Sequence, residues 1–220
     1  MKKHIVCFGD SNTHGYCGDP ADCADHGNRF NEDERWPCLL QKKLGGEFLV
    51  LEEGLDGRTT VFDDPIKGGR CGLGHICTVL ETHEPVDLLI IMLGTNDVKE
   101  RFGVSALNIS AGLERLIKKA KAVECWADGV PNIMIVSPPC ISDRIEQIPL
   151  RLEKMGKGCP EKSRGLAENF RNAAKANNCE FLDAEGVAEF NQVDFIHLTA
   201  NGHRQLAEAL YIKIKDTFIK

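Results

Sequence analysis

The chain has 220 residues, of which 42% are hydrophobic and 27% are charged, and its formal net charge is −6. These values are typical of globular proteins and exclude a disordered chain, a collagen-like repeat and a coiled coil. The mild acidity excludes a broad basic face, so we expect no nucleic-acid partner. The longest apolar run, residues 88–93, is far shorter than the roughly 20 residues of a membrane-spanning helix, so we expect no membrane partner.

The length favours a single domain that covers residues 1–220. The apolar stretch near the start ends at Gly9 and is followed by no small-residue cleavage site, which argues against a secretory signal. We therefore expect a cytoplasmic protein whose ten cysteines are reduced.

One group of residues has side chains of the metal-binding type. It contains Cys71, His75 and Cys77, and Cys17 and Cys23 lie upstream of it. The spacings match no common zinc finger, and the chain has no Cys-x-x-Cys pair, so we expect ordinary thiols and no metal. A structural zinc at this group is the alternative, which the sequence leaves open.

Short β-rich runs alternate with helical patterns along the chain. Strands are predicted at residues 4–8, 48–51, 88–93, 133–136 and 180–182. Helices are predicted at residues 37–44 and 76–82, and amphipathic stripes predict three more over residues 109–120, 166–174 and 206–218. Several strands are apolar throughout, which is typical of strands covered on both faces. The alternation predicts an α/β fold with a parallel sheet between two layers of helices.

Ligands of parallel α/β sheets bind beyond the carboxyl ends of the strands, so the segments after each strand are the place to search for a site. Two long segments without a clear period, residues 16–35 and 138–161, follow predicted strands. We interpret them as candidate walls of a site, with surface insertions as the alternative.

The first strand runs into the heptapeptide GDSNTHG, residues 9–15. A serine at such a strand-to-helix turn, here Ser11, can present its hydroxyl at the rim of the sheet. The third strand ends in LGTND, residues 93–97, where the amide of Asn96 could donate into the same crevice or cap the next helix. Either motif alone is a weak signal, because all of these residues are also common in turns.

Asp194 and His197 lie three residues apart near the C-terminus, and Thr199 is a candidate N-cap for the last helix. Residues with this spacing can share a face, so the carboxylate could accept from one ring nitrogen and leave the other free. A solvated pair, or a histidine satisfied in the core, is the alternative interpretation.

Together these motifs indicate a serine hydrolase. A neutral hydroxyl is a poor nucleophile, so Ser11 needs a base, which His197 could supply while Asp194 holds the imidazole. The N–H of Ser11 and the side chain of Asn96 are candidate donors to an oxyanion. A third donor is expected from the turn at residues 54–60, where glycine allows close backbone approach.

The chain resembles the SGNH (GDSL-type) hydrolases. Four blocks match in the family's order between residues 9 and 197: Gly9-Asp10-Ser11 with Thr13 and Gly15, Gly57, Gly94-Thr95-Asn96-Asp97, and Asp194-x-x-His197. The segments EEGL at 52–55, RTT at 58–60 and IIMLGTND at 90–97 resemble in particular the bacterial arylesterase/acyltransferase branch.

The resemblance implies a three-layer flavodoxin-like α/β/α fold with a central five-stranded parallel sheet. It also implies an esterase without metal or cofactor, in which Ser11, Gly57 and Asn96 supply the oxyanion hole. The sequence departs from the pattern at Asn12, where the namesake motif has leucine, and at His14, where this branch often has an aromatic residue. Together with Asp10, these two residues are our candidates for contact with substrate.

We therefore predict a serine esterase that hydrolyses short-chain acyl esters, small molecules, through an acyl-enzyme intermediate. Transfer of the acyl group to alcohols stays open, because it depends on how dry the pocket is. An acyl-CoA thioesterase and a carbohydrate acetylesterase are alternatives on the same triad. A non-catalytic phosphate- or flavin-binding module is disfavoured, because no P-loop and no Gly-x-Gly-x-x-Gly follows the first strand. A homo-oligomer is expected from the family.

Overall fold

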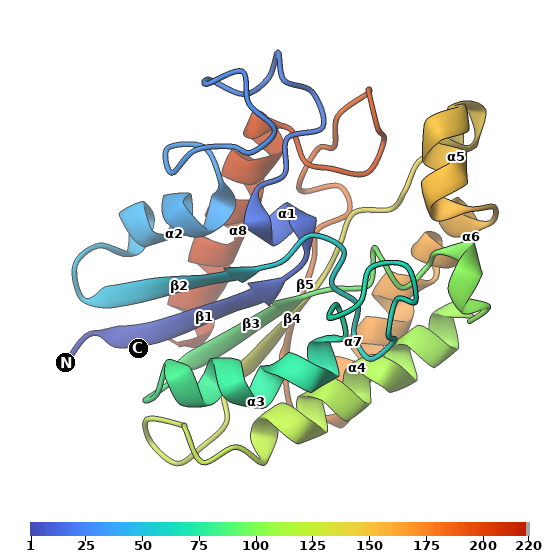
Figure 1. The fold of residues 1–220 in the computed structure, drawn as a ribbon. Coiled ribbons are helices and arrows are strands. Elements are labelled where there is room, and N and C mark those ends of the chain that lie inside the picture. Colours follow the sequence, from blue (N-terminus) through green and yellow to red (C-terminus); the bar gives the residue numbers. More distant parts are fainter. Residues whose placement is uncertain (219–220) are drawn as a thin grey trace.

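The computed structural model describes residues 1–218, and its centre is a sheet of five parallel strands in the order β2-β1-β3-β4-β5 (Figure 1). The strands are β1 (Lys3–Gly9), β2 (Phe48–Gly54), β3 (Leu88–Met92), β4 (Ile133–Ser137) and β5 (Glu180–Asp183). All five predicted strands are present. In the pairing register Gly9 lies opposite both Gly54 and Met92, so β1, β2 and β3 end at the same level.

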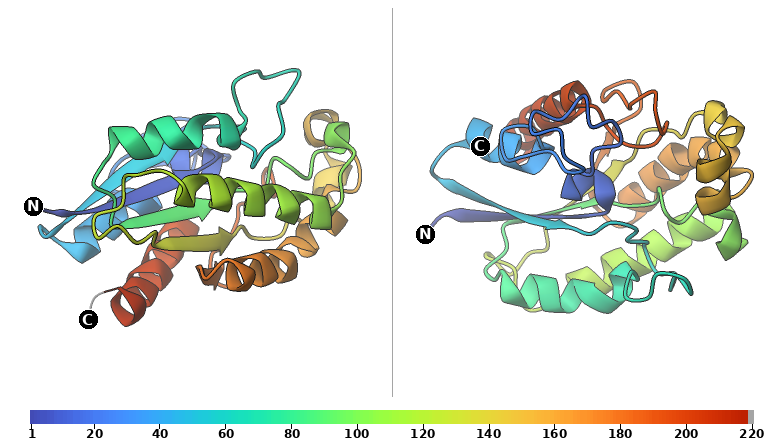
Figure 2. Two further views of the ribbon diagram at one scale, coloured as in Figure 1. Left: turned by 90° about the horizontal axis from the view of Figure 1, so that it is seen from below. Right: turned by 45° about the horizontal axis from the view of Figure 1, so that its top comes forward.

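Helices cover both faces of this sheet (Figures 1 and 2). One face carries α1 (Ser11–His14), α2 (Trp36–Leu44) and α8 (Ala200–Thr217). The other carries α3 (Gly72–Thr82), α4 (Ala106–Lys121) and α7 (Leu166–Ala176). The prediction of a three-layer α/β/α fold with a five-stranded parallel sheet is confirmed. Within residues 1–218, no helix combines the length and the apolar character needed to cross a membrane.

The apolar strands pack on both layers because their side chains alternate between the two faces. In β1, Val6 and Phe8 belong to the core beneath α3, α4 and α7. Ile5 and Cys7 belong to the core beneath α2 and α8. This two-sided burial is the physical reason for the continuous apolar runs in the sequence.

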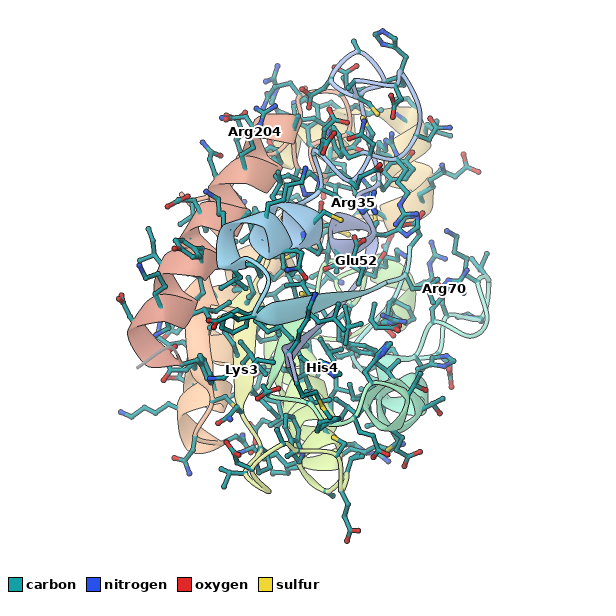
Figure 3. The ribbon with its side chains drawn as sticks, turned by 90° about the vertical axis from the view of Figure 1, so that its left-hand side faces the viewer. Lys3, His4, Arg35, Glu52, Arg70 and Arg204 are labelled. Carbon is teal, nitrogen blue, oxygen red and sulfur yellow. The ribbon has the colours of Figure 1, made fainter. Side chains whose placement is uncertain are left out.

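Strand β2 continues three residues beyond the predicted end at residue 51. The extra residues include Glu52 and Glu53, whose charges hide the strand pattern in the sequence. Each carboxylate has a partner at this sheet edge. Glu52 accepts from Arg35 at 2.6 and 2.9 Å, which ties the start of α2 to β2 (Figure 3), and Glu53 pairs with His83 at 2.7 Å.

Residues 138–161 differ from the expectation of a segment without regular structure. They contain the 3₁₀ helix η2 (Asp143–Gln147), all of α5 (Pro149–Met155) and the start of α6 (Cys159–Arg164). A further 3₁₀ helix, η1 (Glu100–Phe102), follows β3. Each piece is too short to repeat an apolar stripe, and glycines with positive φ at 156 and 158 separate α5 from α6. Residues 16–35 hold turns and a single bridge, Tyr16 to Arg29.

Gly54, at the end of β2, sets how closely α1 packs on the sheet. A Cβ at this position would lie 2.1 Å from the backbone nitrogen of His14 and 2.6 Å from its Cα. Neither backbone atom can move without displacing α1, which begins at Ser11.

We expect Gly54→Ala to lower the free energy of unfolding by about 1–3 kcal/mol, because the added methyl overpacks the contact between strand and helix. Urea unfolding followed by circular dichroism measures this effect. Gly74→Ala is the matched control, since nothing lies within 4 Å of its Cβ position on α3. Alanine there should raise stability by up to about 1 kcal/mol through its helix propensity. Wild-type stability in Gly54→Ala would contradict the proposed packing.

Candidate active site

Ser11 is placed by the turn between β1 and α1, at the carboxyl end of β1, which lies between β2 and β3 in the sheet. Asp10 caps the helix, since its carboxylate accepts from the backbone N–H of Asn12 at 3.0 Å. Ser11 is the first residue of α1, and Gly15, with φ of 86°, ends the helix. The strand-to-helix turn predicted for this serine is therefore present.

Asn191 shapes the loop that carries Asp194 and His197. Its side-chain oxygen accepts from the backbone N–H of Asp194 at 2.7 Å. Its amide nitrogen donates to the Asp194 carboxylate and to the carbonyl of His197, both at 2.9 Å. The hydroxyl of Thr199 accepts from Gly202 N–H at 2.8 Å and caps α8, as predicted. Sequence reasoning missed Asn191, whose spacing from Asp194 is the ordinary signature of a turn.

Ser11, His197 and Asp194 form a continuous chain of hydrogen bonds. The Ser11 hydroxyl lies 2.9 Å from His197 Nε2, and His197 Nδ1 lies 2.6 Å from Asp194 Oδ2. Burial acts to raise the pKa of Asp194, but hydrogen bonds from the ring and the backbone of His197 hold it well below its ordinary value. An ionised carboxylate can only accept, so Nδ1 donates its proton to Asp194 and Nε2 accepts from Ser11. The arrangement can therefore take up the serine proton.

The loops that follow β2 and β3 meet next to Ser11. Asn96 follows β3, and Gly57, with φ of 83°, lies in the turn after β2; both line the cavity next to Ser11. The amide nitrogen of Asn96 lies 3.2 Å from the Arg58 carbonyl and 3.4 Å from Asp10 Oδ2. Asp97 ties the two loops together, because its Oδ1 accepts from the backbone N–H of Thr60 at 2.9 Å and from its hydroxyl at 2.5 Å.

The site opens into a cavity of about 430 Å³. The Tyr16 ring forms one wall, with its centroid 4.5 Å from that of His197 and its plane tilted by 49°. Residues 151 and 153–155 of α5 form another. Both long segments that the sequence analysis singled out, 16–35 and 138–161, therefore contribute to the walls.

Asp10, Asn12 and His14, the residues expected to contact substrate, do not line this cavity. Asp10 and Asn12 are each only 1% exposed. The Asn12 side chain accepts from the backbone N–H of Leu198 at 3.0 Å and joins α1 to the C-terminal loop. The His14 carbonyl accepts from Arg29 Nε at 2.8 Å. Asp10 and Asn12 therefore hold the turn of α1 in place, and contact of Asp10, Asn12 or His14 with substrate stays a prediction.

The cysteine–histidine group has other partners. The Cys71 thiol donates to the Val61 carbonyl at 3.2 Å, and His75 Nε2 lies 3.2 Å from the Gly69 carbonyl. Across the part of the chain that the structure describes, no three His, Cys, Asp or Glu side chains are grouped so that they could hold a metal ion. All ten cysteines are free thiols.

Asp10 is a buried acid beneath the site. Burial raises its pKa from 3.8 to about 6, although the hydrogen bond from Asn12 opposes the shift. The folded protein therefore binds more protons than the unfolded chain between about pH 4 and 6. Stability contributed by this group is lost as pH rises through that window.

Asp10→Asn removes this titration. We subtract the unfolding free energy of the wild type from that of the variant. We expect this difference to increase by up to about 3 kcal/mol between about pH 4 and 6 and to stay constant at higher pH. Urea unfolding of both proteins across this pH range measures the difference. A difference that stays constant with pH would show that the Asp10 carboxyl ionises as readily in the fold as in the unfolded chain.

Comparison with known proteins connects this geometry to a family. The model of the GDSL-like lipase/acylhydrolase family matches residues 7–205. The structure of the Mycobacterium smegmatis (M. smegmatis) aryl esterase is similar at 34% identity and a TM-score of 0.85, over 97% of this chain and 99% of that one. A carbohydrate acetylesterase family member from Sinorhizobium meliloti is similar at 35% identity and a TM-score of 0.86, over 97% and 98%.

Est24, a carbohydrate acetylesterase from Sinorhizobium meliloti, is similar at 30% identity and a TM-score of 0.87, over 99% of this chain and 100% of that one. Comparison with the curated proteins found no match. The family match spans most of the chain and includes the segments that carry Ser11, Asn96 and His197. The chain belongs to the GDSL-like lipase/acylhydrolase family.

Proposed function

We propose that the protein hydrolyses small, short-chain acyl esters with a triad of Ser11, His197 and Asp194. The observation that carries the proposal is the hydrogen-bonded chain from Ser11 Oγ through His197 to Asp194, which opens into a cavity beside Gly57 and Asn96. Family membership makes the protein a serine hydrolase of ester bonds.

In the first step the Ser11 oxygen attacks the ester carbonyl carbon while its proton passes to His197 Nε2. The negative charge of Asp194 stabilises the imidazolium that forms and keeps the ring in this orientation. The tetrahedral intermediate collapses as His197 returns the proton to the departing alcohol, which leaves an acyl group on Ser11. Water then attacks the acyl-enzyme by the same sequence and releases the acid.

The oxyanion hole is assigned to the backbone N–H groups of Ser11 and Gly57 and to the side-chain amide of Asn96. The present partners of the Asn96 amide lie at 3.2 and 3.4 Å, at the long end of hydrogen-bond distances. An oxyanion carries a full negative charge and is a stronger acceptor than the neutral Arg58 carbonyl, so it can replace that partner when it forms. Loss of one such donor typically costs roughly 3 kcal/mol of transition-state stabilisation.

The size of the cavity supports a small substrate. A volume of about 430 Å³ lies at the lower end of ordinary ligand pockets. Of the solved relatives, one is named as an aryl esterase and two as carbohydrate acetylesterases. The acetyl group that gives the latter their name is a short acyl group. An acetylated carbohydrate is the second candidate, favoured by these relatives. Transfer to an alcohol would use the same acyl-enzyme, with the alcohol in place of water.

The nucleophile is tested with Ser11→Ala. We expect the variant to lose about 10³-fold or more of the wild-type kcat on p-nitrophenyl acetate, because among residues 1–218 it is the Ser11 hydroxyl that hydrogen-bonds to His197 Nε2. A sulfonyl fluoride should label Ser11 in the wild type and leave the variant unlabelled, as peptide mass spectrometry measures. Ser110→Ala, a serine on α4 outside the cavity lining, is the control. Undiminished turnover in Ser11→Ala would refute the assignment.

Gly18 leaves room for the triad carboxylate. A Cβ there would lie 2.1 Å from Asp194 Oδ2, the oxygen that accepts from His197. We expect Gly18→Ala to lower kcat by at least about tenfold, because the methyl displaces the acid that orients the imidazole. Gly27→Ala in the same segment is the matched control, since its Cβ would approach no atom closer than 3.9 Å. Equal kcat values for the two variants would exclude a role for this contact.

A further inference from the structure

The cavity in front of Ser11 has an excess of positive charge, although the whole chain has a formal net charge of −6. Five basic residues line it: Lys67, Lys99, Arg101, Arg151 and Lys154. Three carboxylates, those of Asp56, Asp64 and Glu153, also line it. Arg151 is near the triad acid, but Lys67, Lys99, Arg101 and Lys154 form no ion pair with a triad residue among residues 1–218. Ester cleavage alone therefore does not explain the position of these four charges.

Asp64 holds several of these basic residues in place. Its carboxylate is fully buried and lies 3.3 Å from the Arg101 guanidinium and 3.7 Å from the Lys99 ammonium. The same carboxylate accepts from the backbone N–H groups of Ile66 and Lys67, at 3.0 and 3.3 Å. One negative charge therefore holds two basic side chains and also forms the turn that presents Lys67 to the cavity.

Helix α5 supplies a second part of the charged lining, with Arg151 and Lys154. Arg101 connects the two parts, because its guanidinium also donates to the backbone carbonyl of Lys154. Arg151 lies 3.8 Å from Asp194 Oδ2 and is otherwise turned to the cavity. Among residues 1–218, neither Lys67 nor Lys154 forms an ion pair with another side chain, so both are available to a ligand.

We propose that the substrate is an ester that carries a carboxylate, which Lys67 and Lys154 bind in the cavity that Arg101 and Arg151 also line. The proposal rests on the proposed esterase function and specifies its substrate class. Basic residues from several segments around one pocket concentrate anions, so a carboxylate near the ester would be drawn into the cavity beside Ser11. Asp64 is shared by Lys99 and Arg101, and with Asp56 and Glu153 it still leaves the five basic residues of the cavity lining in excess over its three carboxylates.

The test compares matched esters at low salt. The first pair is p-nitrophenyl hemisuccinate, which carries a carboxylate in its acyl part, and the neutral p-nitrophenyl butyrate. The second pair is 4-acetoxybenzoate, which carries the carboxylate in its alcohol part, and the neutral methyl ester of that compound. We expect an anionic member to exceed its neutral partner in kcat/KM by about tenfold, and the ratio to fall as salt screens the charges. The pair with the larger ratio identifies the end of the substrate that carries the charge.

The double variant Lys67→Gln with Lys154→Gln should reduce this ratio by about tenfold. The control removes two charges elsewhere, Lys118→Gln on α4 with Lys175→Gln on α7, and should keep the wild-type ratio, since neither residue lines the cavity. If the wild type prefers neutral esters, or if the preference for anionic esters survives in the Lys67/Lys154 variant, the inference is wrong and the esterase proposal stands.

A binding measurement separates the inference from the esterase proposal. Ser11→Ala cannot form the acyl-enzyme, so its affinities for 4-acetoxybenzoate and for the methyl ester can be measured by calorimetry. Tighter binding of the carboxylate, lost in the triple variant with Lys67→Gln and Lys154→Gln, supports the inference. Equal binding overturns it. If the wild type hydrolyses none of the four esters, the esterase proposal fails and this comparison alone decides the anion site.

Discussion

The contact between the two ends of the chain governs the site. Asn12 on α1 accepts from the backbone of Leu198, and beside this bond Ser11 meets His197, 186 residues away in sequence. The sheet makes the contact possible, because parallel strands deliver the turn after β1 and the loops after β2 and β3 to one edge. Among residues 1–218, the Asn12 bond and the Ser11–His197 bond are the side-chain hydrogen bonds that join α1 to the C-terminal loop.

Buried carboxylates around Ser11 behave differently because their partners differ. Asp194 receives hydrogen bonds from the ring and backbone of His197 and from the backbone of Ile196, and these outweigh its burial, so its pKa lies well below the ordinary value. Asp10 and Asp97 have fewer donors, and burial raises the pKa of each to about 6. Burial alone therefore does not set the charge of an acid here; the number and strength of the donors facing it do.

Several parts of this arrangement were readable from the sequence. The apolar runs of β1 and β3 follow from burial on two faces, and the stripes of α4, α7 and α8 follow from burial on one. The motif around Ser11 indicated a turn, and a turn is present. Helix α5 and the end of β2 were missed, because short helices repeat no stripe and because Glu52 and Glu53 find their partners only after folding.

The sequence by itself determined the alternation of strands and helices, the fold class and the residue types from which a triad can be built. These properties depend on local periodicity and on side-chain chemistry, which each segment carries alone. Only the tertiary structure decided that Asn12 joins α1 to the C-terminal loop and that Asn191 and Gly18 lie against Asp194. It also decided that basic residues from three segments face one cavity. Such relations depend on contacts between segments far apart in the chain, which no local pattern encodes.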